Sequence, residues 1–303
     1  MSNVQIKSIG DILFLEVDQP HFFGPCSRSP NGRFTIAWSD ADPSGRVGGS
    51  RKEGLGTYLL LNGSNIVLTG KMERPNDGKV SDTGIFILND WMFGDELNGT
   101  FYAFSPSGHV LIKETFRANL YDNGLSTDGR LAACGTAGSE YKDDSNVLCI
   151  FDLESKNMVG KFVPITGHAK EYKFDGPDRT VSLVYKDNTS YRYSFNGTFL
   201  DIAQWQKDRA LNGSGYEILY IAEILLDNLH GSELALYSEV IDMLYRALDK
   251  GVSENTQALI HRLLGETYNR CGETTKAIDH LGNALRLNSK IGVKKLYQSL
   301  TGT

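Results

Sequence analysis

The sequence predicts a multidomain α+β protein, with an all-β part in the first two thirds and an all-α part in the last third. Two observations support this division. Before about residue 205, Gly, Asn, Asp and Ser separate short runs that are rich in β-branched and aromatic residues. After it, the chain contains no Pro and few Gly, and its apolar residues follow helical spacing. We therefore expect two domains, at residues 1–205 and 206–303.

Size and charge narrow the classes of function. A chain of 303 residues is long enough for two domains with separate cores. Its net charge of −6 argues against a nucleic-acid partner, which needs a basic face. We find no signal peptide and no apolar run long enough for a membrane span. Four widely spaced cysteines fit a reducing compartment, so a cytoplasmic location is expected.

The β part repeats a turn followed by a strand, with a period of roughly 45 residues, which is the length of one four-stranded propeller blade. The turns contain pairs that tolerate positive φ, such as Asn31-Gly32 and Asp128-Gly129. The four repeated units lie at residues 29–39, 80–90, 125–136 and 174–186. This periodicity predicts about four successive antiparallel sheets.

One unit, GTFYAFSPSGHVLIKETF at residues 99–116, resembles the inner strand pair of pyrroloquinoline-type and WD-repeat β-propellers. The resemblance implies a propeller-like domain of about four to five blades. It carries over no functional residues, because the Gly-His and Trp-Asp signature of WD repeats is missing. The strands expected at residues 4–8 and 11–17 belong either to a fifth blade or to the closure of the ring, and a twisted open β-structure is the alternative.

The last third reads as five helices joined by short turns. Each segment opens with Ser or Thr, which cap helix N-termini, and several end at Gly, which suits a helix C-terminus. The expected helical segments are residues 214–231, 232–251, 253–272, 274–288 and 289–300. Their order predicts antiparallel helical hairpins.

Residues 258–288 resemble a tetratricopeptide repeat. Seven positions match the pattern of that family: Leu264, Gly265, Tyr268, Gly272, Ala277, Leu281 and Ala284. Two positions depart from it, since His261 replaces the usual large aromatic residue and Ser289 replaces a frequent Pro. The preceding hairpin matches weakly, and the last helix resembles a terminal cap. An array of two repeats is short, so we expect the helices to dock on the β part or on another chain.

The resemblance also implies a binding groove. Its lining residues on the clear repeat would be Leu259, Arg262, Glu266 and Asn269. Packing of this face against the β part is the alternative. A second candidate for partner contact is the apolar run Trp91-Met92-Phe93, for which burial in the core is the alternative.

Nothing in the sequence predicts an enzyme, a cofactor or a metal site. The usual motifs for hydrolases, zinc proteases, dinucleotides and phosphates are missing. Asp40, Asp42 and Ser44 imitate the start of a calcium loop, but Arg51 stands where a Glu is required. The six histidines, His230 among them, show no ligand spacing. Cys134 and Cys149 are expected to be small core residues, with a disulfide as the alternative.

The main hypothesis is therefore a non-enzymatic protein-interaction or scaffolding protein that binds a protein partner through the helical groove and the loops of the β part. An oligomer or a hetero-complex is compatible with it. One alternative is a propeller-type hydrolase or cofactor-dependent enzyme, which the fold alone would suggest. Another is an inhibitor or immunity protein that masks a basic partner with the acidic β part.

Overall fold

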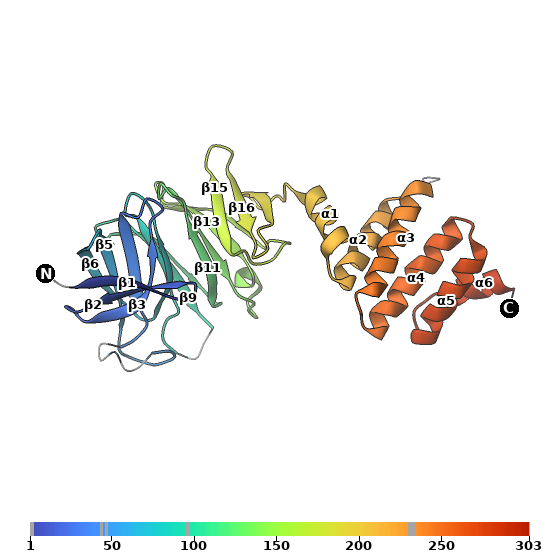
Figure 1. Cartoon of the computed structure of the whole chain (residues 1–303), viewed down its shortest axis with the longest axis horizontal. Helices are drawn as coiled ribbons and strands as arrows, with labels where there is room; N and C mark the ends of the chain where they lie inside the picture. Colours follow the sequence, from blue (N-terminus) through green and yellow to red (C-terminus); the bar gives the residue numbers. More distant parts are fainter. Residues whose placement is uncertain (1–2, 43–44, 46–47, 95–96, 230–233, 303) are drawn as a thin grey trace. The chain divides into compact units, whose positions relative to one another are not determined.

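The computed structural model describes residues 3–42, 45, 48–94, 97–229 and 234–302. Contacts divide the chain into two units, Met1–Leu200 and Asp201–Thr303. Figure 1 shows that the first unit is built from strands and the second from helices. The predicted fold class, an all-β part followed by an all-α part, is confirmed. Ser44 and His230, considered above, lie outside the described residues.

The strands of the first unit are short, and tight turns join most of them. They are β1 (Val4–Ile9), β2 (Ile12–Val17), β3 (Phe22–Arg28), β4 (Phe34–Ser39), β5 (Gly56–Asn62), β6 (Asn65–Met72), β7 (Pro75–Val80), β8 (Phe86–Asp90), β9 (Gly99–Phe104), β10 (Val110–Phe116), β11 (Leu120–Leu125), β12 (Leu131–Thr136), β13 (Leu148–Asp152), β14 (Asn157–Phe162), β15 (Glu171–Asp175), β16 (Thr180–Val184) and β17 (Ser190–Ser194).

These strands form four antiparallel sheets, and each sheet uses strands that are consecutive in the sequence. The sheets are β1–β6, β7–β10, β11–β14 and β15–β17. The expected turns occur, since Gly32 and Gly129 adopt φ values of 72° and 77°. Such left-handed conformations suit Gly, which has no Cβ to clash with the backbone. The roughly 45-residue period therefore corresponds to one sheet per repeat.

Apolar side chains fill the space between successive sheets. Strand β8 shows why the inner sheets are apolar on both faces: Phe86 and Leu88 belong to the cluster shared with the first sheet, and Ile87 to the cluster shared with the third. All three residues have 0% exposure. A further cluster joins β12 and β13 to β16 and β17. Because each inner sheet buries both faces, the core of this unit is continuous through the stack.

The four sheets are not closed into a ring. On the fourth sheet, Tyr172 and Val181 are buried, whereas Lys173 and Arg192 point to the other face and are exposed. A face that closes a ring has to bury apolar residues, so the stack ends at this polar face. The N-terminal pair β1–β2 extends the first sheet beside β3, and it forms neither a fifth blade nor a ring closure. Of the arrangements considered from the sequence, the open one is observed.

The second unit contains helices α1 (Ile202–Asn212), α2 (Gly215–Asn228), α3 (Leu234–Asp249), α4 (Glu254–Arg270), α5 (Thr274–Leu287) and α6 (Lys294–Thr301). Helices α2 and α3 form one hairpin, and α4 and α5 form a second. Sequence analysis missed α1, because its residues were assigned to the domain boundary. Within the described residues, no helix has both the length and the apolar character needed to cross a bilayer.

Local signals explain the helix ends and the packing. Ser214 and Glu217 form a reciprocal capping box at the start of α2, and Ser253 caps α4. Gly265 allows α4 and α5 to approach closely, because a Cβ at this position would lie 2.6 Å from the Cγ of Leu281. Ala277 and Ala284, two small residues that match the repeat pattern, are fully buried. Small residues at these positions therefore allow the two helices to pack closely.

Candidate binding groove of the helical unit

Helix α2 exposes one stripe of aromatic and acidic side chains. Tyr216 and Tyr220 are 64% and 45% exposed, and Glu223 and Asp227 continue the same line toward the helix C-terminus. Spacings of four, three and four residues place these four side chains on one helix face. The opposite face carries the buried residues of the core, such as Ile218. This stripe is therefore a helix surface that the unit does not use for its own packing.

Helix α4 presents a charged face toward α2. Arg262 Nε donates to Glu266 Oε1 at 3.0 Å, one helical turn away. Arg270 Nη1 donates to the carbonyl oxygen of Leu226 at 3.4 Å, near the C-terminal end of α2. These contacts hold the two arginine side chains in place along the edge of the groove.

The two helix faces border a hollow of about 270 Å³. Its lining residues are Glu223, Leu226, Asp227, Arg262, Leu263, Glu266, Thr267 and Arg270. Two of the four groove residues expected from the repeat, Arg262 and Glu266, therefore come together at the hollow. Leu259 and Asn269 lie on α4 and are half-buried, but they do not line it.

A smaller, aromatic hollow of about 60 Å³ continues the stripe between α1 and α2. Trp205 from α1 lies here with Tyr216 and Tyr220, and Arg209 and Glu217 form an ion pair beside them. Trp205 is buried, whereas the two tyrosines are exposed. We call the two hollows and the α2 stripe between them the α2 groove. It has an aromatic end and a charged end.

The charged end is not balanced within the described residues. Arg262 is paired with Glu266, whereas the structure records no ion pair for Glu223 or Asp227 in the described part of the chain. Glu223 is half-buried and Asp227 is exposed, and three carboxylates line the hollow against the two arginines, Arg262 and Arg270. A carboxylate without an ion pair favours the approach of a cation. The α2 groove therefore offers an apolar contact at one end and two uncommitted acidic groups at the other.

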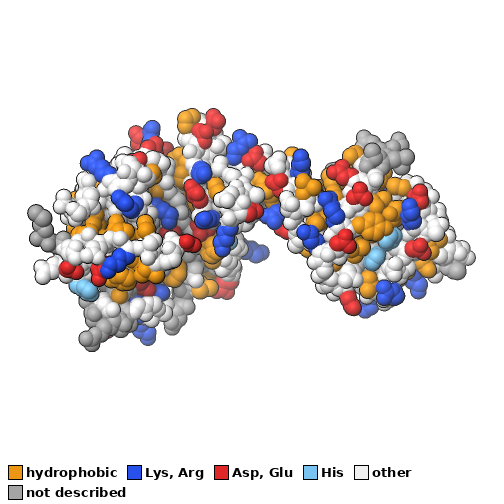
Figure 2. Space-filling model, viewed as in Figure 1, with side chains coloured by type: hydrophobic (Ala, Val, Ile, Leu, Met, Phe, Trp, Pro, Cys, Tyr) orange, Lys and Arg blue, Asp and Glu red, His pale blue; other side chains and the backbone are white. Residues whose placement is uncertain are grey.

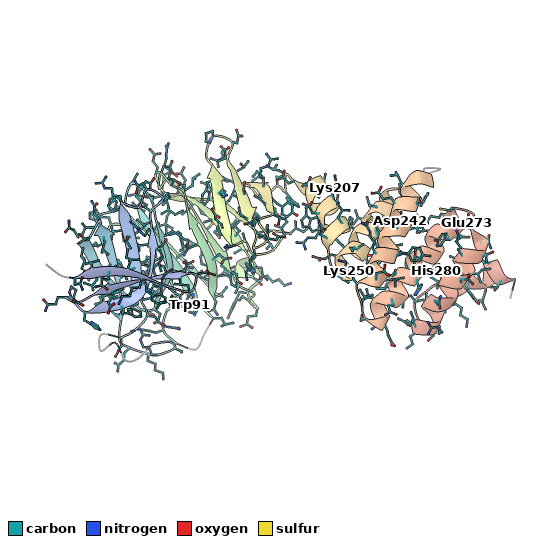
Figure 3. The ribbon with its side chains drawn as sticks, in the orientation of Figure 1. Trp91, Lys207, Asp242, Lys250, Glu273 and His280 are labelled. Atoms are coloured by element: carbon teal, nitrogen blue, oxygen red, sulfur yellow. The ribbon has the colours of Figure 1, made fainter. Side chains whose placement is uncertain are left out.

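Trp91 and Phe93, the other predicted contact residues, lie in the first unit just after β8 (Figure 3 labels Trp91). The guanidinium of Arg74 lies 5.8 Å from the Trp91 ring, and that of Arg51 lies 5.4 Å from the Phe93 ring. Arg51 Nη1 also donates to Asp40 at 2.7 Å. These rings are thus engaged by arginines of their own unit, although Trp91 remains 38% exposed.

The same contacts show how the two acidic residues Asp40 and Asp90 are used. Asp40, which began the calcium-like pattern, accepts a hydrogen bond from Arg51, the residue that occupies the Glu position. Asp90 accepts backbone hydrogen bonds from Arg74 and Met92, and burial nevertheless raises its pKa. No group of three or more His, Cys, Asp or Glu suited to a metal occurs among the described residues.

Cys134 and Cys149 are free thiols that lie opposite each other on β12 and β13. The neighbouring hydrogen bond from Thr136 N to Val147 O, two residues along the same ladder, makes Cys134 and Cys149 a hydrogen-bonded pair. Cβ atoms in such pairs are about 5.5 Å apart, which is wider than the 3.5–4.5 Å that a disulfide needs. Burial raises the pKa of the Cys149 thiol to about 12. Both residues therefore serve as small core side chains.

A larger cleft of about 1200 Å³ lies in the first unit, between the third and fourth sheets. The turns of the first three sheets are tied together, since Asn31 N donates to Asp82 Oδ1 at 2.8 Å and Thr83 Oγ1 donates to the carbonyl of Asp128 at 3.2 Å. The lining includes apolar residues such as Phe174, with Arg130 and Arg179 among the charged residues. Sequence analysis did not identify this cleft.

Sequence analysis also missed the residues of the α2 stripe and Arg270. The first hairpin resembles the repeat family only weakly, so no groove positions were carried over to α2. A signal was present nonetheless. Tyr216, Tyr220, Glu223 and Asp227 follow helical spacing on a face that contains no aliphatic residue.

Comparison with known proteins gives little further information. No protein-family model matches the sequence, and no curated protein matches it. The crystal structure of the computationally designed Ika4 protein is similar over 56% of this chain and 89% of that chain, with 10% identity and a TM-score of 0.37. The β-propeller domain of Myceliophteria thermophila Cps50 (Swd1) is similar over 64% of this chain and 68% of that chain, with 9% identity and a TM-score of 0.36. Both TM-scores are too low to support an argument about the fold. The fold assignment therefore depends on the strand order described above.

Proposed function

We propose that this chain is a non-enzymatic protein-interaction module that binds a segment of a partner protein in the α2 groove. The observation that carries the proposal is the exposed stripe of α2, which faces Arg262, Glu266 and Arg270 across the hollow. Two neighbouring helices that present aromatic and charged side chains beside a hollow form a surface that can accept a peptide or helix. The tetratricopeptide resemblance of residues 258–288 supports the same surface, because that family binds peptides through such helix faces.

The chemistry of the groove specifies the segment. Tyr216 and Tyr220 supply large, rigid contact surfaces that suit an apolar or cationic side chain. Glu223 and Asp227 favour Lys or Arg at the other end. We therefore propose a partner segment that carries at least one basic residue next to an apolar one.

The experiment selects peptides from a random display library on the purified full-length chain. We expect enrichment of peptides with Lys or Arg, and we expect E223K/D227K to weaken their binding at least tenfold. E239K/D249K is the matched control, because it makes the same charge change at exposed positions of α3. The proposal is wrong if no peptide is enriched, or if the two double variants weaken binding equally.

A second candidate function is the binding of a small molecule in the cleft of the first unit, favoured by its volume of about 1200 Å³. Pockets for small ligands typically have volumes of about 300–1,000 Å³ and combine apolar walls with a few polar groups. A ligand-library screen by thermal shift would test this candidate. A hit that is lost in R179A and kept in E223K/D227K would favour it.

A further inference from the structure

Four aromatic side chains from three helices form a hydrogen-bonded cluster in the second unit. They are Tyr245 on α3, His261 and Tyr268 on α4, and His280 on α5. His261 Nδ1 lies 2.9 Å from His280 Nδ1, and Tyr245 Oη lies 3.0 Å from His280 Nε2 and 3.2 Å from Tyr268 Oη. Figure 2 shows histidine side chains at the surface of this unit beside hydrophobic ones. None of the four residues lines the α2 groove.

The contact between the two histidines holds a single proton. A neutral imidazole has one N–H donor and one acceptor nitrogen. One Nδ1 must therefore donate and the other must accept. If His280 donates from Nε2 to Tyr245, its Nδ1 is the acceptor. When His261 then carries its proton on Nε2, both Nδ1 atoms have a free lone pair and are 2.9 Å apart.

We propose that His261 and His280 form a binding site for a divalent transition metal ion, Zn²⁺, Ni²⁺ or Cu²⁺, which takes the place of the shared proton. Two nitrogens that are each about 2.0–2.1 Å from one ion lie roughly 2.9 Å apart when the angle at the ion is a right angle, as in square-planar Cu²⁺ or Ni²⁺, and roughly 3.3 Å apart at tetrahedral Zn²⁺. The Nδ1 separation of 2.9 Å is close to the first value and within a few tenths of an ångström of the second. Imidazole nitrogens prefer these ions to Mg²⁺ and Ca²⁺, which select oxygen ligands.

The surroundings of the pair support a cation. Tyr245 contacts the second ring nitrogen of His280, as groups that orient metal-bound histidines do. Burial lowers the pKa of both His261 and His280, which favours the neutral form of each ring. The charged groups that act on the cluster are of both signs: Asp242, Glu273 and Asp279 are acidic, whereas Arg286 and Lys276 are basic. Figure 3 labels Asp242 and Glu273 on the same unit as His280.

The expected site is a simple one. His261 and His280 are the two protein ligands, and water completes the coordination, because no third His, Cys, Asp or Glu joins them among the described residues. Both rings are half-buried, so solvent and ion can reach them. A site with two protein ligands predicts weaker binding than a structural zinc site with four. By connecting α4 to α5, a bound ion would stabilise the second hairpin.

Calorimetric titration of the chelator-treated full-length protein with Zn²⁺ and Ni²⁺ tests the proposal. We expect one ion per chain. H261Q and H280Q should each weaken binding at least tenfold, while the control H21Q/H109Q, altered in the first unit, should bind as the unaltered chain does. Circular dichroism of each variant shows whether it is folded. No binding at millimolar ion, or equal binding by H280Q and the control, would overturn the proposal.

Electron paramagnetic resonance with Cu²⁺ gives a second measurement, which identifies the atoms that bind the ion. The spectrum should show coupling to two imidazole nitrogens, and H280Q should reduce this to one. Y245F should keep both nitrogens but weaken Zn²⁺ binding about tenfold, because the loss of such an orienting contact costs 10–100-fold. A spectrum without nitrogen coupling would reject the site, whatever the result for the α2 groove.

Discussion

Trp91 in the first unit and Tyr220 in the second are similarly exposed, at 38% and 45%, but they are used differently. The Trp91 ring is covered by Arg74, and its loop is fixed by hydrogen bonds to Asp90. Tyr220 lies on a helix face beside a hollow. Exposure therefore does not distinguish a binding surface from a packed loop. What distinguishes them is whether the side chain already has a partner in its own unit.

The same contrast extends to the cores of the two units. The first unit depends on sheets that pack through both faces, so its stability resides in side chains from distant parts of the sequence. The second depends on contacts between neighbouring helices, and the most extensive of them is between α4 and α5. The second unit can therefore leave a whole helix face unused, whereas the inner sheets of the first cannot.

The largest expected loss of stability comes from a substitution in the core of the first unit. Phe101 is fully buried between the second and third sheets, and its ring stacks on Phe151 at 5.0 Å. Phe101→Ala should lower the free energy of unfolding by about 3–5 kcal/mol, through lost burial and the cavity that remains. Urea unfolding followed by tryptophan fluorescence measures this. A loss below 1 kcal/mol would show that the sheets do not share a tightly packed core.

The corresponding change in the second unit adds volume at the closest helix contact. Gly265→Val should destabilise the second unit by about 1–3 kcal/mol, because a new side chain meets Leu281 and its backbone nitrogen. Gly282→Ala is the matched control on α5, where a Cβ would have its nearest neighbour at 3.5 Å. Circular dichroism at 222 nm during urea unfolding follows the helices. If both variants unfold alike, α4 and α5 do not approach as closely as the structure shows.

These two sites also show what could be predicted from the sequence. Gly265 and Leu281 are near in sequence and belong to a repeat pattern, so the predicted helical hairpin brings the segments that carry them together. Phe101 and Phe151 are fifty residues apart, and their stacking depends on how two sheets pack, which strand periodicity does not specify. The missed α2 stripe has a similar cause, because a helical pattern identifies an exposed face but does not show which helix lies opposite it. The sequence pattern also did not show whether the sheets close into a ring. They stay open because the outer face of the fourth sheet is polar.

A smaller effect is expected from Asp122 on β11, and it depends on pH. Burial, and then the charge of Asp77, raises the pKa of Asp122 from 3.8 to about 7, and Lys79 and Lys186 oppose this. The folded state thus holds the proton more tightly than the unfolded chain. The stability that this proton provides is present below pH 3.8 and is lost as the pH rises through about 7.

Asp122→Asn should therefore stabilise the first unit at pH 8 by about 1–2 kcal/mol, a value reduced to allow for solvent screening, and should have little effect at pH 3.5. Urea unfolding at several pH values measures the difference. Asp128→Asn should show the opposite trend, since hydrogen bonds from Ser126 and Arg130 outweigh burial and lower the pKa of Asp128. A pH-independent difference between D122N and the unaltered chain would contradict the assignment.

The smallest changes in stability test the opening comparison directly. Trp91→Ala should cost about 0.5–1 kcal/mol, because it removes the partner of Arg74. Tyr220→Ala should change stability by less than about 0.5 kcal/mol, as is usual for an exposed residue without special contacts. The two variants should differ in the opposite sense in peptide binding. A peptide selected on the unaltered chain should bind W91A normally and Y220A at least tenfold more weakly. If W91A loses the peptide and Y220A keeps it, the binding surface lies in the first unit, and a side chain already held by an arginine is available to a partner after all.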